Sequence, residues 1–260
     1  QSCSHRVGFC PELQEKISTF SDGGVAVRAV RAVIPVKRVK DAKQRLASVL
    51  NASERRDLFV AMFEDVLDVV TAVQDFQEVT VATVCPTARE IAKRHGASVL
   101  STGRDEGQTM AVANTAVTME AEGVISMLML PGDIPLLTVK EIRTVLDAHE
   151  KKTPAMTIVP ARDELGSNCI VLSPPTAIPL RFGPNSYFPH LKSARRLGLV
   201  PQTPKLPGIG LDIDTLEDLS LLCHTPGNTR SQEYLQDQRI VERLGDFDEV
   251  SSRFVDGNTA

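Results

Sequence analysis

Apolar runs and amphipathic stretches alternate along most of this chain. Short apolar runs with the length of strands lie near 27–36 and at 78–84, 97–101, 124–130, 155–161 and 168–173. Stretches with helical spacing of apolar residues lie at 52–73, 86–96, 107–123, 138–152 and 186–198. Strand and helix patterns that alternate in this way predict a single α/β domain, in which a mainly parallel sheet is flanked by helices.

Local signals refine three of these elements. The run at 124–130 is continuously apolar, which is typical of a central parallel strand covered on both faces. The helix at 52–73 has Ser53 as its candidate N-cap, but Arg56 stands where a capping box needs Glu or Gln. The segment 208–223 predicts a short strand, a turn and a helix.

The two ends of the chain differ from this alternating region. Residues 1–24 show little periodicity and end in Asp-Gly-Gly, so we expect 1–25 to be a flexible N-terminal extension. Residues 225–260 are polar, acid-leaning and partly helical in pattern, and we expect a C-terminal extension there. The α/β domain is then expected over 26–224.

Composition excludes several classes of protein. The chain has 260 residues and a formal net charge of −4, which argues against a general nucleic-acid binder. No apolar run approaches the roughly 18 residues of a membrane span, and residues 1–24 lack the apolar core of a secretory signal. The five cysteines are scattered without paired spacing, as reduced thiols would be. We therefore expect a cytoplasmic protein with neither membrane nor nucleic acid as a partner.

Polar features follow three of the predicted strands, where open parallel sheets bind their ligands. The first is the loop in "IPVKRVKDAKQRL" (34–46), which carries Lys37, Arg38, Lys40, Lys43 and Arg45. Such a loop suits a triphosphate, whose charge must be neutralised before its α-phosphorus is attacked. It lacks the Walker A pattern, and on its own a solvated charged loop explains it at least as well.

Acidic side chains make up the other two features. Asp133 follows the apolar run in "LMLPGDIPLLT" (128–138), and Asp212 and Asp214 form a D-x-D in "GLDIDT" (210–215). Alternate residues of an extended segment point the same way, so both carboxylates of the D-x-D can face one site. Carboxylate oxygens are natural ligands of Mg²⁺, although each feature alone is also explained by a turn or a helix cap. Together with the basic loop they predict metal-assisted nucleotidyl transfer.

Two later segments and one glycine turn could complete such a site. "DELGSNCIV" (163–171) and "RFGPNSYFPH" (181–190) combine Gly with Ser and Asn, which suits a phosphate cradle as well as ordinary surface loops. The turn before the helix at 107–123 could place Gln108 or Asn114 near a base or a substrate. A contact between His190 and an anion is possible, but we interpret His190 as a surface histidine.

Six segments in order resemble the 2-phospho-L-lactate guanylyltransferase family, also described as phosphoenolpyruvate guanylyltransferase, which serves biosynthesis of the deazaflavin coenzyme F-420. They are "IPVKRVKDAKQRL", "DEGQTMAVANTA", "LPGDIPLLT", "DELGSNCIVL", "FGPNSYFPHLKSARRLG" and "GLDIDTLEDL". The resemblance covers roughly residues 28–222. It implies a nucleotidyltransferase fold of the glycosyltransferase-A, Rossmann-like type. It also implies transfer of GMP from GTP to the phosphate of a small phosphorylated acid, with release of pyrophosphate.

The resemblance also implies roles for individual residues. Asp133, Asp212 and Asp214 match the ligands of Mg²⁺ and, with Lys43, the catalytic residues. The acid is expected against Ser167, Asn168, Gly183 and Ser186. Nucleotide binding is expected from Pro35, Lys37, Lys43, Arg45, Gly107, Gln108 and Asn114. GTP and the acid are the expected partners, with the downstream deazaflavin transferase and a second copy of this chain as further candidates.

The chain departs from the family pattern near the predicted acceptor. Gly132 stands where the family commonly has Ala, Ser167 where Thr is usual, and Gln108-Thr109-Met110 where the helix typically begins differently. These departures leave the acid open among phosphoenolpyruvate, 2-phospho-L-lactate and 3-phospho-D-glycerate. The alternatives are another nucleotidyltransferase, a glycosyltransferase of the same fold type and a non-catalytic nucleotide-binding scaffold. An ionised phosphate needs no general base to attack, which agrees with the lack of a well-placed histidine.

Overall fold

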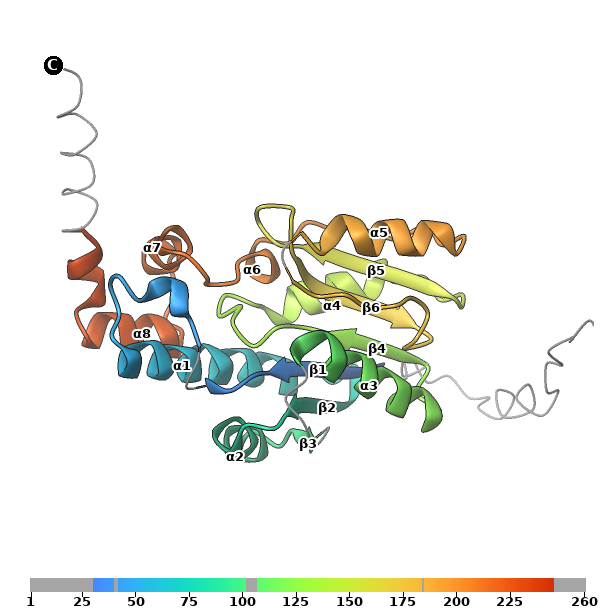
Figure 1. The fold of residues 1–260 in the computed structure, drawn as a ribbon, viewed down its shortest axis with the longest axis horizontal. Helices are drawn as coiled ribbons and strands as arrows, with labels where there is room; N and C mark the ends of the chain where they lie inside the picture. The colour runs from blue at the N-terminus through green and yellow to red at the C-terminus, as the bar shows by residue number, and fades with distance from the viewer. Residues whose placement is uncertain (1–29, 40–41, 102–106, 184, 246–260) are drawn as a thin grey trace, which may run out of the picture.

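The computed structural model describes residues 30–39, 42–101, 107–183 and 185–245, and its centre is a six-stranded sheet (Figure 1). The strands are β1 (Val30–Val36), β2 (Phe76–Thr83), β3 (Ser98–Leu100), β4 (Ser126–Met129), β5 (Ala155–Pro160) and β6 (Ser167–Ser173). Their order is β3-β2-β1-β4-β6-β5. The pairs among β1 to β4 are parallel, whereas β6 is antiparallel to both β4 and β5. The predicted mainly parallel sheet is confirmed, with β6 as its one reversed strand.

Helices cover both faces of the sheet. They are α1 (Ala52–Thr71), α2 (Pro86–Arg94), α3 (Gly107–Ala121), α4 (Val139–Ala148) and α5 (Tyr187–Arg196). Alternate residues of β1 enter different clusters, because side chains of a strand point to opposite faces of the sheet. Ala32 and Ile34 pack with α1, α2 and α4, whereas Val33 packs with α3 and α5. The continuous apolar character of β1 and β4 follows from burial on both faces.

A third cluster of buried apolar side chains lies beside α1. It joins the short helix Gln44–Leu46 to α1, α7 (Leu216–His224) and α8 (Arg230–Asp237), through residues such as Leu46, Leu58, Leu219 and Leu235. Figure 1 shows α8 beside α1, and α7 packs on α8. The described part of the predicted C-terminal extension is therefore helical and packed on the core, and the domain division at residue 224 stays a prediction.

A buried carboxylate fixes α8 on α1. Asp65 accepts hydrogen bonds from the backbone N–H groups of Arg230 and Ser231, at 2.8 and 3.0 Å, and from the Ser231 hydroxyl at 2.7 Å. Burial raises the pKa of Asp65, although these donors oppose the rise. The carboxylate thus satisfies N–H groups at the start of α8 that the helix itself cannot bond.

Two local predictions are wrong. The N-cap of α1 is Asn51 instead of Ser53, and a complete capping box joins Asn51 to Glu54. The predicted short strand at the start of 208–223 is instead a helical turn, α6 (Pro207–Gly210), followed by a segment without regular secondary structure that leads into α7. Pro at the first helical position favours this turn, because its missing N–H is not needed there.

The sheet order creates a place for a ligand. The chain winds from β1 through β2 to β3 and then returns to place β4 on the other side of β1. The carboxyl ends of β1 and β4 therefore flank a switch point, where open α/β sheets bind their ligands. Among the residues that the structure describes, no helix has the length and apolarity that crossing a membrane requires.

Candidate active site

A pocket of about 880 Å³ lies at the carboxyl ends of β1, β4 and β5 and at the start of β6. Its volume is within the range of small-molecule sites. It gathers most of the predicted site residues: Pro35, Lys37, Lys43, Arg45, Gln108, Asp133, Ser167, Asn168, Gly183, Ser186, Asp212 and Asp214. Gly107 and Asn114 are not among its lining residues, so the structure does not bring these two into the pocket.

Lys43 is the central cation of the pocket. Its side chain is 3% exposed, and its ammonium donates to Asp133 Oδ2 at 2.5 Å and to Asp214 Oδ1 at 2.9 Å. Its backbone is left-handed, with φ 55°, directly before the short helix Gln44–Leu46. Burial alone would lower the pKa of Lys43, but the two carboxylates raise it above its ordinary value. Lys43 therefore stays charged and links the loop after β1 to both acidic segments.

The D-x-D segment is held against the loop that follows β4. The backbone N–H of Ile213, between the two aspartates, donates to the carbonyl oxygen of Asp133 at 3.1 Å. On its far side, Thr215 caps α7 in a capping box with Asp218. These contacts fix the segment at its middle and where it enters α7, and Asp212 and Asp214 both line the pocket as their alternation predicts.

The two carboxylates of the D-x-D differ in their electrostatics. Burial, with the charge of Asp133, raises the pKa of Asp212 to about 6. Burial also raises the pKa of Asp214, but the Lys43 ammonium outweighs it, with help from Arg45 and Lys37, and the pKa falls below its ordinary value. Asp214 is thus ionised at neutral pH, whereas the ionised form of Asp212 is the one that an added cation would stabilise more.

Asn168 supports the D-x-D segment from β6. It is buried, and its amide nitrogen donates to the carbonyl oxygens of Ile209 and Gly210 and to Asp212 Oδ1, at 3.0, 3.1 and 2.9 Å. The side-chain N–H groups of Asn168 are therefore used to hold the acidic segment in place. The predicted contact of Asn168 with the acid stays a prediction.

Neutral side chains form the opposite side of the pocket. Ser167 at the start of β6 and Ser186 before α5 lie in hydrogen-bond contact, with 3.1 Å between their hydroxyl oxygens. Gly183 lies beside them with φ 134°, a conformation that favours glycine. His190 lies behind the two serines and is 1% exposed, so its interpretation as a surface histidine is wrong.

Comparison with known proteins identifies the family. A protein-family model described as "Guanylyl transferase CofC like" matches residues 30–253. The chain belongs to this family. It is 34% identical to the phosphoenolpyruvate guanylyltransferase of Conexibacter woesei, over 74% of this chain and 86% of that protein. It is also 34% identical to the 3-phospho-D-glycerate guanylyltransferase of Colwellia psychrerythraea, over 74% of this chain and 90% of that one.

The fold of this guanylyltransferase is shared with a solved nucleotidyl transferase of Methanothermobacter thermautotroptrophicus, with a TM-score of 0.54 at 15% identity over 80% of this chain and 98% of that structure. A protein of Desulfovibrio desulfuricans G20 assigned to the nucleotide-diphospho-sugar transferases superposes with a TM-score of 0.66 at 16% identity. The match covers 83% of this chain and 98% of that structure. The predicted nucleotidyltransferase fold is confirmed.

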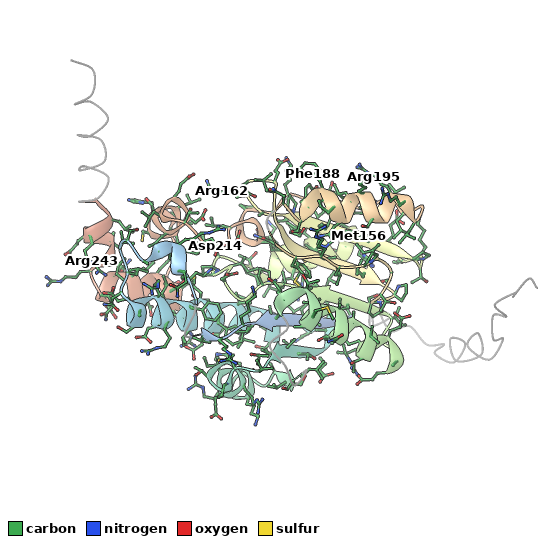
Figure 2. All side chains as sticks on the ribbon, viewed as in Figure 1. Met156, Arg162, Phe188, Arg195, Asp214 and Arg243 are labelled. Carbon is green, nitrogen blue, oxygen red and sulfur yellow. The ribbon has the colours of Figure 1, made fainter. Side chains whose placement is uncertain are left out.

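Several pocket residues of this guanylyltransferase had no clear signal in the sequence. Arg162, after β5, donates to Glu217 and Asp218 at 3.0 Å each and lies with Asp214 near α6 and α7 (Figure 2). Phe59 of α1 and Phe182 line the pocket as well. An arginine in a loop and single aromatic residues are common at any surface, so only the fold reveals that these side chains converge.

The acidic side chains do not form a ready-made metal centre. Across the described ranges, no group of three or more His, Cys, Asp or Glu side chains is arranged to hold a metal ion. Lys43 occupies the space between Asp133 and Asp214 in this structure.

Proposed function

We propose that this guanylyltransferase moves GMP from GTP to the phosphate of a small phosphorylated acid in coenzyme F-420 biosynthesis. The relatives named above point to phosphoenolpyruvate or 3-phospho-D-glycerate as the acid, with 2-phospho-L-lactate as a third candidate. One observation carries the proposal. A single pocket joins the basic loop, the three aspartates and a neutral side lined by hydroxyl groups.

The basic loop supports the binding of GTP. Lys37 and Arg45 are exposed at the pocket, unlike the buried Lys43. Arg45 lies 3.8 Å from Asp214, close enough for attraction while its guanidinium stays accessible. In our proposal Lys37 and Arg45 bind the triphosphate and offset the negative charge that the leaving pyrophosphate develops. Gln108 at the start of α3 is a candidate contact for the base.

Mg²⁺ fits the donor set of the pocket. All three aspartates offer carboxylate oxygens, which Mg²⁺ prefers as ligands. Burial, and after it the charge of Asp133, raises the pKa of Asp212, so a divalent cation would stabilise the ionised form of this carboxyl group. Asp133, Asp212 and Asp214 are the residues that would hold the ion. When bound, it would neutralise phosphate charge and polarise the α-phosphorus for attack.

The reaction needs binding and orientation more than proton transfer. An oxygen of the acceptor phosphate attacks the α-phosphorus of GTP, and a new P–O bond forms. The bond from the α-phosphorus to the oxygen that bridges to the β-phosphorus breaks, and pyrophosphate leaves. The attacking oxygen is already ionised, so no side chain has to remove a proton. The neutral side of the pocket then serves to orient the acid for in-line attack.

The test is turnover of the purified chain with GTP and Mg²⁺, with each of the three acids supplied separately. Pyrophosphate release gives the rate, and the mass of the product identifies the guanylylated acid. We expect one acid to be turned over faster than the others by at least about tenfold, since a site that matches one acid leaves polar groups unpaired with another. Folded protein that binds GTP but turns over none of the three acids would contradict the proposal.

A further inference from the structure

His190 lies just behind the neutral side of the pocket, and both of its ring nitrogens are in hydrogen bonds. Nε2 lies 2.9 Å from the backbone nitrogen of Arg181, and Nδ1 lies 3.0 Å from the hydroxyl oxygen of Ser167. The ring also meets Phe182 edge-on, with 5.4 Å between ring centroids. His190 itself does not line the pocket, although Ser167 and Phe182 do.

The contact with Arg181 fixes which ring nitrogen carries the proton. A backbone N–H can only donate, so Nε2 of His190 must accept and cannot hold a proton of its own. Burial lowers the pKa of His190 to about 4, so the ring is neutral near pH 7. A neutral imidazole has one N–H, which is therefore on Nδ1.

This tautomer determines the direction of the Ser167 hydroxyl. The Nδ1–H of His190 donates to Ser167 Oγ, and the hydroxyl of Ser186 donates to the same oxygen at 3.1 Å. A hydroxyl oxygen has two acceptor positions, and both are then filled. The proton of Ser167 is left for a third partner, on the side where Ser167 lines the pocket.

We propose that His190 is a positioning residue, which orients the Ser167 hydroxyl so that it donates a hydrogen bond to an anionic oxygen of the acceptor acid. The inference rests on the proposed function and adds a criterion for the substrate. A serine held in this way donates and cannot accept, so it favours a carboxylate or phosphate oxygen over a hydroxyl or amine at the same place. His190 supplies this preference without a charge of its own.

The first test reads the tautomer without any assay of activity. Two-bond ¹H–¹⁵N correlation spectra of the ¹⁵N-histidine-labelled full chain show which ring nitrogen carries the proton, and the His190→Asn variant assigns the signal. We expect a neutral ring protonated at Nδ1 at pH 7. A ring protonated at Nε2, or at both nitrogens, would overturn the proposal, because His190 could not then donate to Ser167 while accepting from Arg181.

The second test separates positioning from packing by kinetics, with the acid that the turnover assay identifies. His190→Leu removes both hydrogen bonds, and we expect the KM for the acid to rise about tenfold while the KM for GTP changes less than about twofold. In His190→Asn the amide N–H can take the place of Nδ1–H, so most of the affinity for the acid should return. His224→Leu, at an exposed histidine of α7, is the control and should have wild-type constants.

A double-mutant cycle shows whether His190 acts through Ser167. Ser167→Ala should raise the KM for the acid about as much as His190→Leu, and the double variant should resemble Ser167→Ala alone. Additive effects, or equal increases in the KM values for GTP and for the acid, would overturn the proposal in favour of a packing role. A wild-type chain that turns over no acid would instead contradict the proposed function, and the tautomer would still be decided by the spectra.

Discussion

The two sides of the pocket are built from different interactions. On one side, the buried ammonium of Lys43 donates to Asp133 and Asp214, and Asp212 lies within the electrostatic influence of Asp133. On the other side, Ser167, Ser186 and His190 form a chain of neutral hydrogen bonds. Charges held close together respond strongly to an arriving cation or triphosphate, whereas oriented neutral dipoles respond mainly to the shape and polarity of a ligand.

This contrast predicts where substitutions act. Changes on the charged side should lower the rate of the chemical step, because charge develops on the phosphates in the transition state. Changes on the neutral side should mainly weaken binding of the acid, because a neutral hydrogen bond holds the acid about equally in the ground state and in the transition state. Substitutions on both sides of the pocket test this division.

Asp133→Asn should give the largest loss. The amide keeps the size of the side chain but removes the charge that binds Lys43 and that would bind Mg²⁺. We expect kcat/KM to fall by about 10²–10³-fold or more, with the fold retained. Pyrophosphate release measures the rate and circular dichroism the fold. Asp57→Asn, at a partly exposed position of α1 outside the pocket, is the control. Near-normal activity of Asp133→Asn would remove this residue from the metal assignment.

The loop after β1 contains one buried lysine, Lys43, and one exposed lysine, Lys37, whose substitutions can be compared. Lys43→Met leaves Asp133 and Asp214 without their shared partner, and we expect a loss of about 10²-fold in turnover and about 1–2 kcal/mol in stability. Lys37→Met removes an exposed charge, so kcat/KM for GTP should fall about tenfold without loss of stability. Steady-state kinetics and urea unfolding distinguish the two. Equal effects of both substitutions would show that burial of Lys43 has no special role.

The pH dependence of stability tests the electrostatics of Asp212. Burial and the charge of Asp133 raise its pKa to about 6 in the folded protein, from an ordinary value of 3.8. The folded state therefore binds this proton more tightly than the unfolded chain does, and its stability falls as the pH rises from about 4 to above 6. Without Mg²⁺, Asp212→Asn should remove this loss.

The expected gain for Asp212→Asn is on the order of 1 kcal/mol at pH 7.5, and near zero at about pH 4, where the wild-type carboxyl is protonated. Urea unfolding in the presence of a chelator measures both values. The same variant should be inactive, since it lacks the carboxylate that Mg²⁺ would bind. A variant that is less stable than the wild type at pH 7.5 would show that Asp212 is not under electrostatic strain.

Much of the fold can be predicted from the sequence, because burial on two faces produces continuous apolar runs and turn residues separate them. The reversal of β6 could not be predicted, since "NCIVLS" has the same composition whichever way the strand runs. The N-cap of α1 could have been found by testing Asn51 with Glu54, because that pair has capping-box spacing.

Only part of the candidate site could be predicted from the sequence. Asp133 could be selected because polar residues at strand ends meet at one edge of a parallel sheet. Asp212 and Asp214 could be selected as an alternating pair of carboxylates, although the strand expected before them is a helical turn. The bridge made by Lys43 depends on a left-handed backbone and on partners 90 and 171 residues away, which no local pattern indicates. His190 has helical spacing with Tyr187 and Leu191, which indicates the buried face of α5, but its polar side chain favoured the surface interpretation.

The smallest expected effects come from a matched pair of glycines, one on each side of the pocket. A Cβ added at Gly132 would lie 3.1 Å from a ring carbon of Phe63, and one added at Gly166 would lie 3.1 Å from the Cβ of Ala161. Both contacts are tight, so each neighbour has to shift by a few tenths of an ångström. We expect Gly132→Ala and Gly166→Ala each to cost about 1 kcal/mol of stability, since small over-packing is relieved by small movements.

The two variants should differ in kinetics because of the residue that follows each glycine. A displaced Asp133 should lower kcat about two- to fivefold with little change in the KM for the acid, whereas a displaced Ser167 should raise that KM by a similar factor with kcat retained. Steady-state kinetics with both substrates separate these outcomes. If both alanine variants lower kcat alone, the neutral side takes part in the chemical step, and the division between a reacting side and a binding side does not hold.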